Sequence, residues 1–269
     1  MMEKETESGF GRTMFRNLLD FYLNGRIRFT NLKNTVVSRY EITPDELFWV
    51  DPSSIQYTMD WNELEHRGRI ERPAHFEKSK FKIAGTILSG DWDLVDKRFE
   101  ENVVYRSFVA HFEEDVPWVE TDLYLDVVER IESGERWWRC SSVECFEKRC
   151  RDLDRLYTEI KQNGYKPQHQ LVCENSTPIL QTRGAKNKNP NQVIRSEIAV
   201  NVGRDGKLIF FDGRNRLSIA KILELDRIPV VILVRHERWQ RLREKVVRGE
   251  VMQSEVPERI RHHPDLPWA

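Results

Sequence analysis

The sequence predicts a mixed fold of the α/β (α+β) class, in which a strand-rich core follows a largely helical segment. Residues 198–211 contain two apolar runs around the turn Arg204-Asp205-Gly206-Lys207, which is typical of a β-hairpin. The second run leads through Asp212-Gly213 into a helix-like stretch of about ten residues. The apolar run 228–234 then follows, so the order is strand, helix, strand.

Composition limits the classes of function. The chain has 269 residues, enough to bury a substantial core. Its 43 Lys and Arg nearly cancel its 44 Asp and Glu, so any surface for nucleic acid must be local. The sequence contains no run of about 18 apolar residues, and its N-terminus lacks the apolar stretch of a secretory signal. We therefore expect a cytoplasmic protein without membrane contact.

The first predicted elements are a helix and a strand. Residues 13–25 have helical periodicity and end in Asn24-Gly25, which often stops a helix. Residues 46–57 are typical of a strand that enters a turn at Asp51-Pro52. Residues 62–82 are polar and basic, and we expect an irregular surface loop there.

The segment 95–163 has the periodicity of helices. One helix is predicted to end at Ser133-Gly134, and a second to begin after Ser141 or Ser142 and to stop at Gly164. The tryptophans of this segment are expected to pack in a core rather than to stack on nucleic-acid bases. Three cysteines recur every five residues, a spacing that suits neither a zinc site nor a redox CxxC pair: Cys140, Cys145 and Cys150. We expect reduced thiols.

The junction between the strand 208–211 and the next helix is the candidate functional site. Helix N-termini expose unpaired N–H groups and a partial positive charge, so they bind anions. Gly213 would let a ligand approach the backbone, and Arg214 and Arg216 carry guanidinium forks that suit phosphate oxygens. Alternatively, Asp212 only caps the helix, and the arginines need no ligand. The residue types alone leave both interpretations open.

The stretch LIFFDGRNRLSIAKILELDRIPVVIL resembles the signature of the ParB/sulfiredoxin superfamily. In that superfamily a strand, a Gly-X-X-Arg loop, a helix rich in Ala and Leu, and an Ile-Pro-Val strand form a nucleotide-phosphate site. The matching positions are Gly213, Arg214, Asn215 and Arg216, followed by Ala220, Lys221 and the triplet 228–230. Upstream, residues 151–173 resemble the family's helix, turn and following strand, and the resemblance covers residues 152–236.

The Asp-Gly form of the loop is closer to the free-serine kinases than to the Gly-Glu-Arg-Arg form of the chromosome-partition proteins. This resemblance implies that Asp212 is catalytic and holds a nucleotide-bound Mg²⁺. It implies that Gly213, Arg214, Asn215 and Arg216 bind the phosphates of a nucleoside triphosphate or diphosphate. Sulfiredoxins carry a Cys in this loop, and none is present here, so sulfinic-acid reduction is not expected.

The expected activity is that of an ATP- or ADP-dependent kinase or an NTP hydrolase, acting on an unidentified small molecule. A general base cannot be aligned, and Asp51 and Glu63 are its candidates. The alternative is a DNA-associated module of the partition or nuclease-like type. Only about 30 residues follow Arg238, too few for the helix-turn-helix domain of partition proteins. Glu237 and Glu244 interleave with the nearby arginines, so we expect any DNA contact to be weak.

The predicted organisation has five parts. They are an N-terminal helix and linker (1–43), a strand and irregular segment that could belong to the core (44–94), a helical insertion or subdomain (95–151), a ParB/sulfiredoxin-like core (152–240), and a C-terminal helix and tail (241–269).

Overall fold

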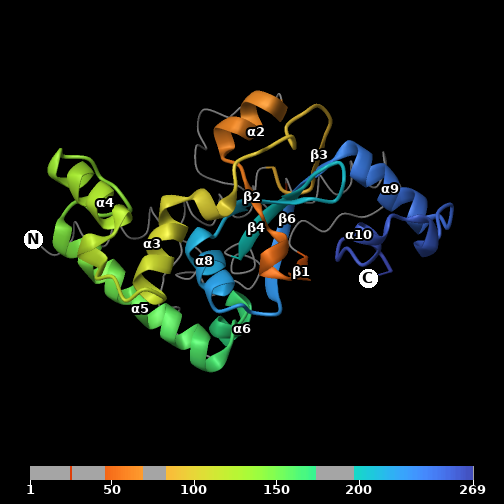
Figure 1. The fold of residues 1–269 in the computed structure, drawn as a ribbon. Helices are drawn as coiled ribbons and strands as arrows, with labels where there is room; N and C mark the ends of the chain where they lie inside the picture. The colour runs from red at the N-terminus through yellow and green to blue at the C-terminus, as the bar shows by residue number, and fades with distance from the viewer. Residues whose placement is uncertain (1–24, 26–45, 69–82, 174–196, 269) are drawn as a thin grey trace, which may run out of the picture.

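The computed structural model of the chain describes Gly25 and residues 46–68, 83–173 and 197–268 (Figure 1). Within these ranges the chain forms a mixed six-stranded sheet flanked by helices, which confirms the predicted α/β class. The strand order is β1-β6-β4-β5-β2, and β3 also pairs with β6. The strands are β1 (Leu47–Val50), β2 (Tyr57–Thr58), β3 (Thr86–Leu88), β4 (Ile198–Val202), β5 (Leu208–Asp212) and β6 (Ile228–His236).

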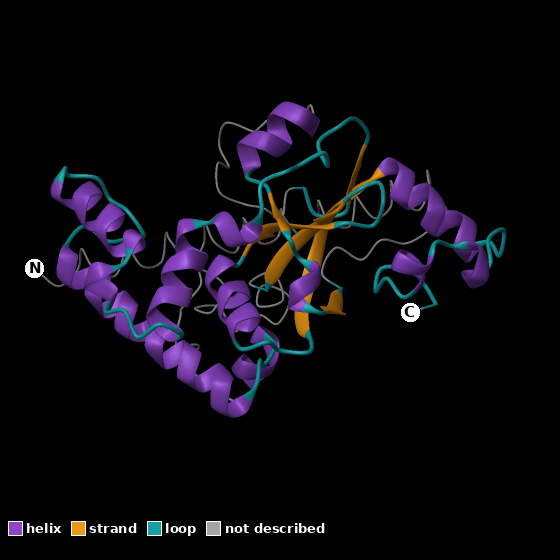
Figure 2. Cartoon of the chain, in the orientation of Figure 1, coloured by secondary structure: helices purple, strands orange, loops and turns teal. Residues whose placement is uncertain are grey.

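The helices lie on both sides of the sheet (Figure 2). They are α2 (Trp61–Gly68), α3 (Val103–Phe112), α4 (Asp122–Glu132), α5 (Val143–Asn163), α6 (Gln168–Cys173), α8 (Arg214–Ile222), α9 (Glu237–Val247) and α10 (Glu258–Arg261). Short 3-10 turns lie at Pro52–Ser54, Phe99–Glu101, Trp118–Glu120 and Gln253–Glu255.

The predicted hairpin and the strand–helix–strand order are both confirmed. β4 and β5 pair antiparallel around the predicted turn, where Gly206 has a φ of 83°. β6 runs parallel to β4 and lies between β4 and β1. Consequently β5 and β6, the two strands joined by α8, run in opposite directions with β4 between them. The unit is therefore not a crossover between neighbouring parallel strands.

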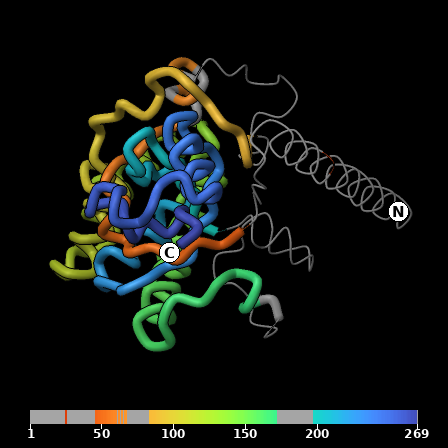
Figure 3. The backbone as a smooth tube through the Cα atoms, turned by 90° about the vertical axis from the view of Figure 1, so that its right-hand side faces the viewer, coloured from red at the N-terminus to blue at the C-terminus, as the bar shows by residue number. Residues whose placement is uncertain are grey.

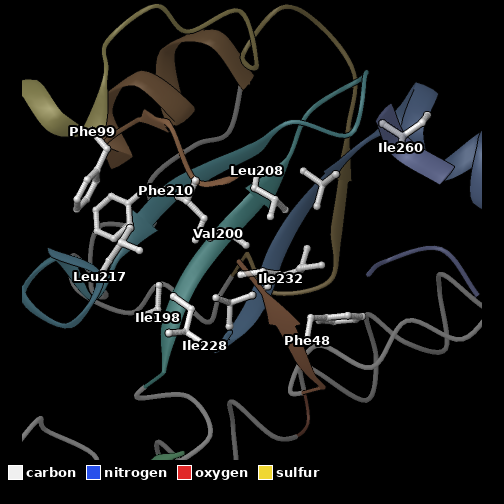
Figure 4. Packing of buried hydrophobic residues seen from close by; sticks show 14 of the residues in the cluster. Phe48, Phe99, Ile198, Val200, Leu208, Phe210, Leu217, Ile228, Ile232 and Ile260 are labelled. Carbon is white, nitrogen blue, oxygen red and sulfur yellow. The ribbon is translucent and has the colours of Figure 1, made fainter. Parts of the chain in front are cut away.

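Each face of the sheet carries its own hydrophobic cluster, and every residue of β4 is buried. On one face Ile198, Val200, Phe210 and Ile232 belong to one cluster, which also includes Leu217 of α8 (Figure 4). The other face is covered by α2 and by the segment 83–95. This cluster includes apolar side chains from the strands and from the segments that cover them: Leu64, Ile83, Trp92, Val95, Ile209 and Leu233.

The helices α3, α4 and α5 form a third cluster, which packs against α8. Phe108 of α3, Leu123 of α4 and Phe146 of α5 are buried together with Ile219 and Ile222 of α8. The helical character predicted for residues 95–163 is confirmed. Because α8 faces the sheet through one side and these helices through another, it holds the two parts together.

Side-chain hydrogen bonds and glycine fix the ends of the helices as predicted. Ser142 caps α5 by accepting a hydrogen bond from the Cys145 N–H at 3.3 Å. Gly164 ends the same helix with a φ of 73°. Trp118 packs in the core as expected, since it is buried and stacks on His111 with 4.1 Å between ring centroids, whereas Trp137 is 39% exposed.

The C-terminal segment lies beside β1 (Figure 3), and a buried ionic cluster fastens it to the sheet. Arg235 of β6 donates two hydrogen bonds from Nε and Nη2 to Asp265, the shortest at 2.7 Å. Trp239 and Arg243 of α9 also donate to Asp265. These two arginines hold the pKa of Asp265 below its usual value, although burial opposes them. The cluster therefore ties α9 and the chain end to one face of the sheet.

Three predictions made from the sequence are wrong within the described residues. Residues 61–68 form helix α2 rather than an irregular loop. Of the side chains described there, only Leu64 is buried, so there is no apolar stripe from which a helix could be predicted. Residues 168–173 form helix α6 rather than the strand that the resemblance implies.

The third wrong prediction concerns the cysteines. Cys140 and Cys145 are joined in a disulfide, and Cys150 is free and buried. The chain reverses just before α5 and brings Cys140, which lies outside the helix, to the first turn that contains Cys145.

The predicted helix at residues 13–25 lies outside the described residues except for Gly25, and so do residues 69–82. Within the described ranges, no helix combines the length and the apolar character needed to cross a bilayer.

Candidate phosphate-binding corner

The candidate corner lies where β5 ends and α8 begins. Gly213 is the N-cap residue of α8, with φ 95° and ψ 28° in the left-handed region. A Cβ at this position would lie 2.9 Å from Cα of Ile198 in the neighbouring strand. Both the backbone conformation and this close approach require glycine.

Asp212 is exposed, and it does not cap the helix. Its Oδ1 accepts a hydrogen bond from the N–H of Gly213 at 2.7 Å. The N-cap residue of α8 is instead Gly213, which supplies no side-chain hydrogen bond. By contrast, His236 caps α9 by accepting from the Arg238 N–H at 3.0 Å. The structure therefore contradicts the interpretation of Asp212 as an ordinary N-cap.

The first turn of α8 combines helix-start N–H groups with one exposed guanidinium. The N–H groups at the start of a helix have no carbonyl partner within that helix. Arg214 is exposed and makes no hydrogen bond or ion pair to any described residue. Although its surface is exposed, the protein atoms packed around it desolvate the guanidinium and lower its pKa, and the nearby Asp212 opposes this shift. An arginine stays charged at neutral pH regardless. Asn215 is half-buried in the same turn.

Arg216 points into the protein rather than toward the exposed side of the corner. Its Nη1 lies 3.1 Å from Oε2 of Glu197 and 3.0 Å from the hydroxyl of Tyr165. Tyr165 also donates to Glu197 at 3.2 Å, and so does the backbone N–H of Gln168. The structure therefore does not bring Arg214 and Arg216 together. Residues two apart on a helix point to different sides. The prediction that assigned both arginines to one phosphate site did not take this into account.

Glu197, Tyr165 and Gln168 are the partners that sequence reasoning missed. Glu197 is fully buried, and burial raises its pKa although Arg216 opposes the shift. Burial likewise raises the pKa of Tyr165. The only signal in the sequence was a charged residue directly before the apolar strand β4. Nothing local pairs it with an arginine 19 residues later.

Asp51, one of the two candidates for a general base, is not brought to the corner. Asp51 accepts a hydrogen bond from the Ser53 N–H at 2.7 Å and lines a cavity of 480 Å³ at the C-terminal end of α8, with Lys221 and Glu224. Nine residues of helix separate that end from Asp212. Glu63 belongs to α2, and its side chain lies outside the described part of the structure.

The donor set at the corner suits a metal only together with a ligand. In the described part of the chain, no group of three or more His, Cys, Asp and Glu side chains could hold a metal ion. Mg²⁺ commonly takes one or two carboxylates together with the phosphate oxygens of a bound nucleotide. Asp212 therefore fits a nucleotide-bound Mg²⁺, but not a resident ion held by protein side chains alone.

The exposed face of α9, the candidate for DNA contact, carries paired charges. Arg241 pairs with Glu237 and Arg248 pairs with Glu244, each one turn apart. These pairs neutralise two of the four exposed basic side chains, and the exposed Arg238 and Lys245 leave a small net positive charge on this face. Such a face suits at most a weak contact with DNA.

Comparison with known proteins adds no relative: no family model matches the chain, and neither does a curated protein or a solved structure. The resemblance to the ParB/sulfiredoxin superfamily stays a prediction.

Proposed function

We propose that the start of α8 binds the phosphate groups of a nucleotide. The observation that supports this proposal is the combination of an N-cap without a side chain, an exposed Arg214, and Asp212 held beside the helix start. The N–H groups of the first turn and the helix dipole favour a phosphate there, and Arg214 adds a charge-assisted hydrogen bond. Gly213 allows the ligand to approach the backbone.

On this proposal the protein is a Mg²⁺-dependent phosphotransferase or NTP hydrolase that acts on a small molecule. Bound Mg²⁺ would neutralise charge on the phosphates, and Asp212 is the side chain that would hold it. Arg214 and the first-turn N–H groups would orient the phosphates. We assign Arg216 a positioning role, because its guanidinium binds Glu197 and Tyr165 and so fixes the start of α8.

Calorimetric titration of the full chain with ATP, ADP, GTP and CTP in the presence of Mg²⁺ tests this proposal. We expect at least one nucleotide to bind with a dissociation constant of about 1 mM or tighter. The Arg214→Ala variant should bind it about tenfold more weakly, since a hydrogen bond to a charged group contributes roughly 1.5–3 kcal/mol. Binding of CTP alone would favour the DNA-associated class.

Arg238→Ala is the matched control. Arg238 is also an exposed arginine in the first turn of a helix, but His236 caps that helix. Its removal should leave nucleotide affinity unchanged. The proposal is refuted if no nucleotide binds at millimolar concentration, or if the two variants weaken binding equally.

A further inference from the structure

The link between α4 and α5 carries two features that the proposed nucleotide site does not use. The first is the disulfide between Cys140 and Cys145. The second is a tight turn in which Trp138 and Arg139 have φ values of 47° and 63°. The Trp137 N–H donates to Cys140 O at 3.0 Å, and the Cys140 N–H donates to Trp137 O at 2.7 Å.

This turn has an unfavourable sequence. Two-residue turns with positive φ at both central positions favour Asn and Gly, because other side chains clash with their own backbone there. Trp138 and Arg139 thus hold a conformation that the surrounding structure must stabilise. The disulfide joins the end of the turn to α5, and the Trp138 ring packs against Phe146 of that helix with 5.7 Å between centroids.

The two sulfurs differ in accessibility. Cys145 lies in the first turn of α5 and is exposed, whereas Cys140 is only 1% exposed. Because Cys145 is the exposed residue of the pair, we expect a dissolved thiol to approach it more easily than Cys140. The arrangement resembles neither a uniformly buried structural disulfide nor a metal site.

We propose that small thiols can reduce the disulfide between Cys140 and Cys145, and that its reduction releases the turn at Trp138-Arg139. We call this disulfide the latch. The thiolate of a low-molecular-weight thiol attacks Sγ of Cys145. The bond to Cys140 breaks, and Cys140 leaves as a thiolate that takes a proton from water. A second thiol attacks the mixed disulfide and frees Cys145. Two small thiols are oxidised to their disulfide, and the protein disulfide gains two electrons.

The latch lies at the far end of α5 from α6, away from the start of α8 (Figure 1). It is a redox-sensitive device of the helical segment, and it does not depend on the proposed nucleotide site. Failure of one proposal would leave the other untouched.

Peptide mapping of the full chain tests the exchange. The protein is equilibrated with reduced or oxidised glutathione, trapped with N-ethylmaleimide and digested with trypsin. Cleavage after Arg139 and Lys148 leaves both cysteines in one peptide, 140–148. With oxidised glutathione this peptide should be unlabelled and lighter by two hydrogens. With reduced glutathione both cysteines should become labelled, Cys145 at least about tenfold faster than Cys140, whose labelling needs local opening.

Limited proteolysis of the native protein tests the release of the turn. Reduction should accelerate tryptic cleavage after Arg136 by about tenfold, because an exposed chain segment is cut only when it opens locally. The double variant Cys140→Ser/Cys145→Ser should show the fast rate without reductant. In Arg139→Gly, which relieves one positive φ, reduction should accelerate cleavage less. A urea midpoint close to that of the wild type establishes that each variant is folded.

Three results would overturn the latch. They are free thiols at both positions in oxidised glutathione, a disulfide that small thiols reduce only after unfolding, and a tryptic rate that reduction leaves unchanged.

Discussion

Replacing Arg216 by alanine should damage the fold before it affects any ligand. The substitution leaves the Glu197 carboxylate fully buried without its cation, beside Tyr165 and the Gln168 N–H. Removing one partner of a buried ion pair costs about 3–5 kcal/mol. Domains have a free energy of unfolding of about 5–15 kcal/mol, so this loss is a large part of the total. Any loss of nucleotide binding in this variant would follow from the disturbed start of α8.

The penalty should depend on pH in a defined direction. Burial raises the pKa of Glu197 in the native protein, and Arg216 opposes that shift. Without the guanidinium the pKa rises further. A carboxyl group whose pKa is higher in the folded state binds more protons there, so stability is lost as the pH rises from the unfolded pKa through the folded one. We expect a smaller penalty at about pH 5 than at about pH 8.

Urea denaturation measures the free energy of unfolding of three proteins: the wild type, Arg216→Ala and the double variant Arg216→Met/Glu197→Leu. The double variant removes both charges at similar volume, and such replacements are often neutral or stabilising. It should therefore recover part of the loss, because Tyr165 and the Gln168 N–H lose their acceptor in the double variant. A loss below about 1 kcal/mol in Arg216→Ala would refute the reasoning, since an exposed pair contributes no more than that. Arg216 would then return to the group of phosphate-binding candidates.

Three further substitutions and one binding measurement follow from the same structure. Asp212→Ser should leave the melting temperature almost unchanged, because Asp212 is exposed, but should abolish nucleotide-dependent turnover in a coupled assay; full activity would contradict its catalytic role. Gly213→Ala should lower the free energy of unfolding, measured by urea denaturation, by at least about 1–2 kcal/mol, because of its positive φ and the clash with Ile198. Asp265→Asn should cost about 3–5 kcal/mol at neutral pH. Because Arg235 holds the pKa of Asp265 low, this contribution is lost as the pH falls below about 4, so variant and wild type should converge there. Binding to duplex DNA, measured by fluorescence anisotropy, should be weak and steeply salt-dependent, and one tight consensus site would contradict this.

Local chemistry made much of the fold predictable. The turn at Gly206, the cap at Ser142 and the stop at Gly164 depend on a few neighbouring residues, and each lies where the sequence placed it. The same holds for the start of α8 at Arg214, since Gly213 adopts a conformation that other residues avoid. These features need no knowledge of distant segments.

The rest could not be predicted because it depends on contacts between segments far apart in the sequence. The opposite directions of β5 and β6 follow from the insertion of β4 between them, which no local pattern encodes. The polar helix α2 is fixed by packing of Leu64 on the sheet rather than by its own periodicity. Glu197 and Arg216 meet only after β4 and α8 have packed together.

The position of α8 explains why its first turn is suited to chemistry and the rest of it is not. Leu217 and Ala220 face the sheet cluster, while Ile219 and Ile222 face the helical cluster, so the helix is buried along most of its length. Arg216 fixes the start of α8 through its ion pair with Glu197. A helix held on both sides offers a ligand only its end, and at the N-terminal end that surface consists of N–H groups, Asp212 and Arg214. On the proposed function, the same packing that turns Arg216 toward Glu197 and Tyr165 would hold Arg214 and the backbone in place to receive a phosphate.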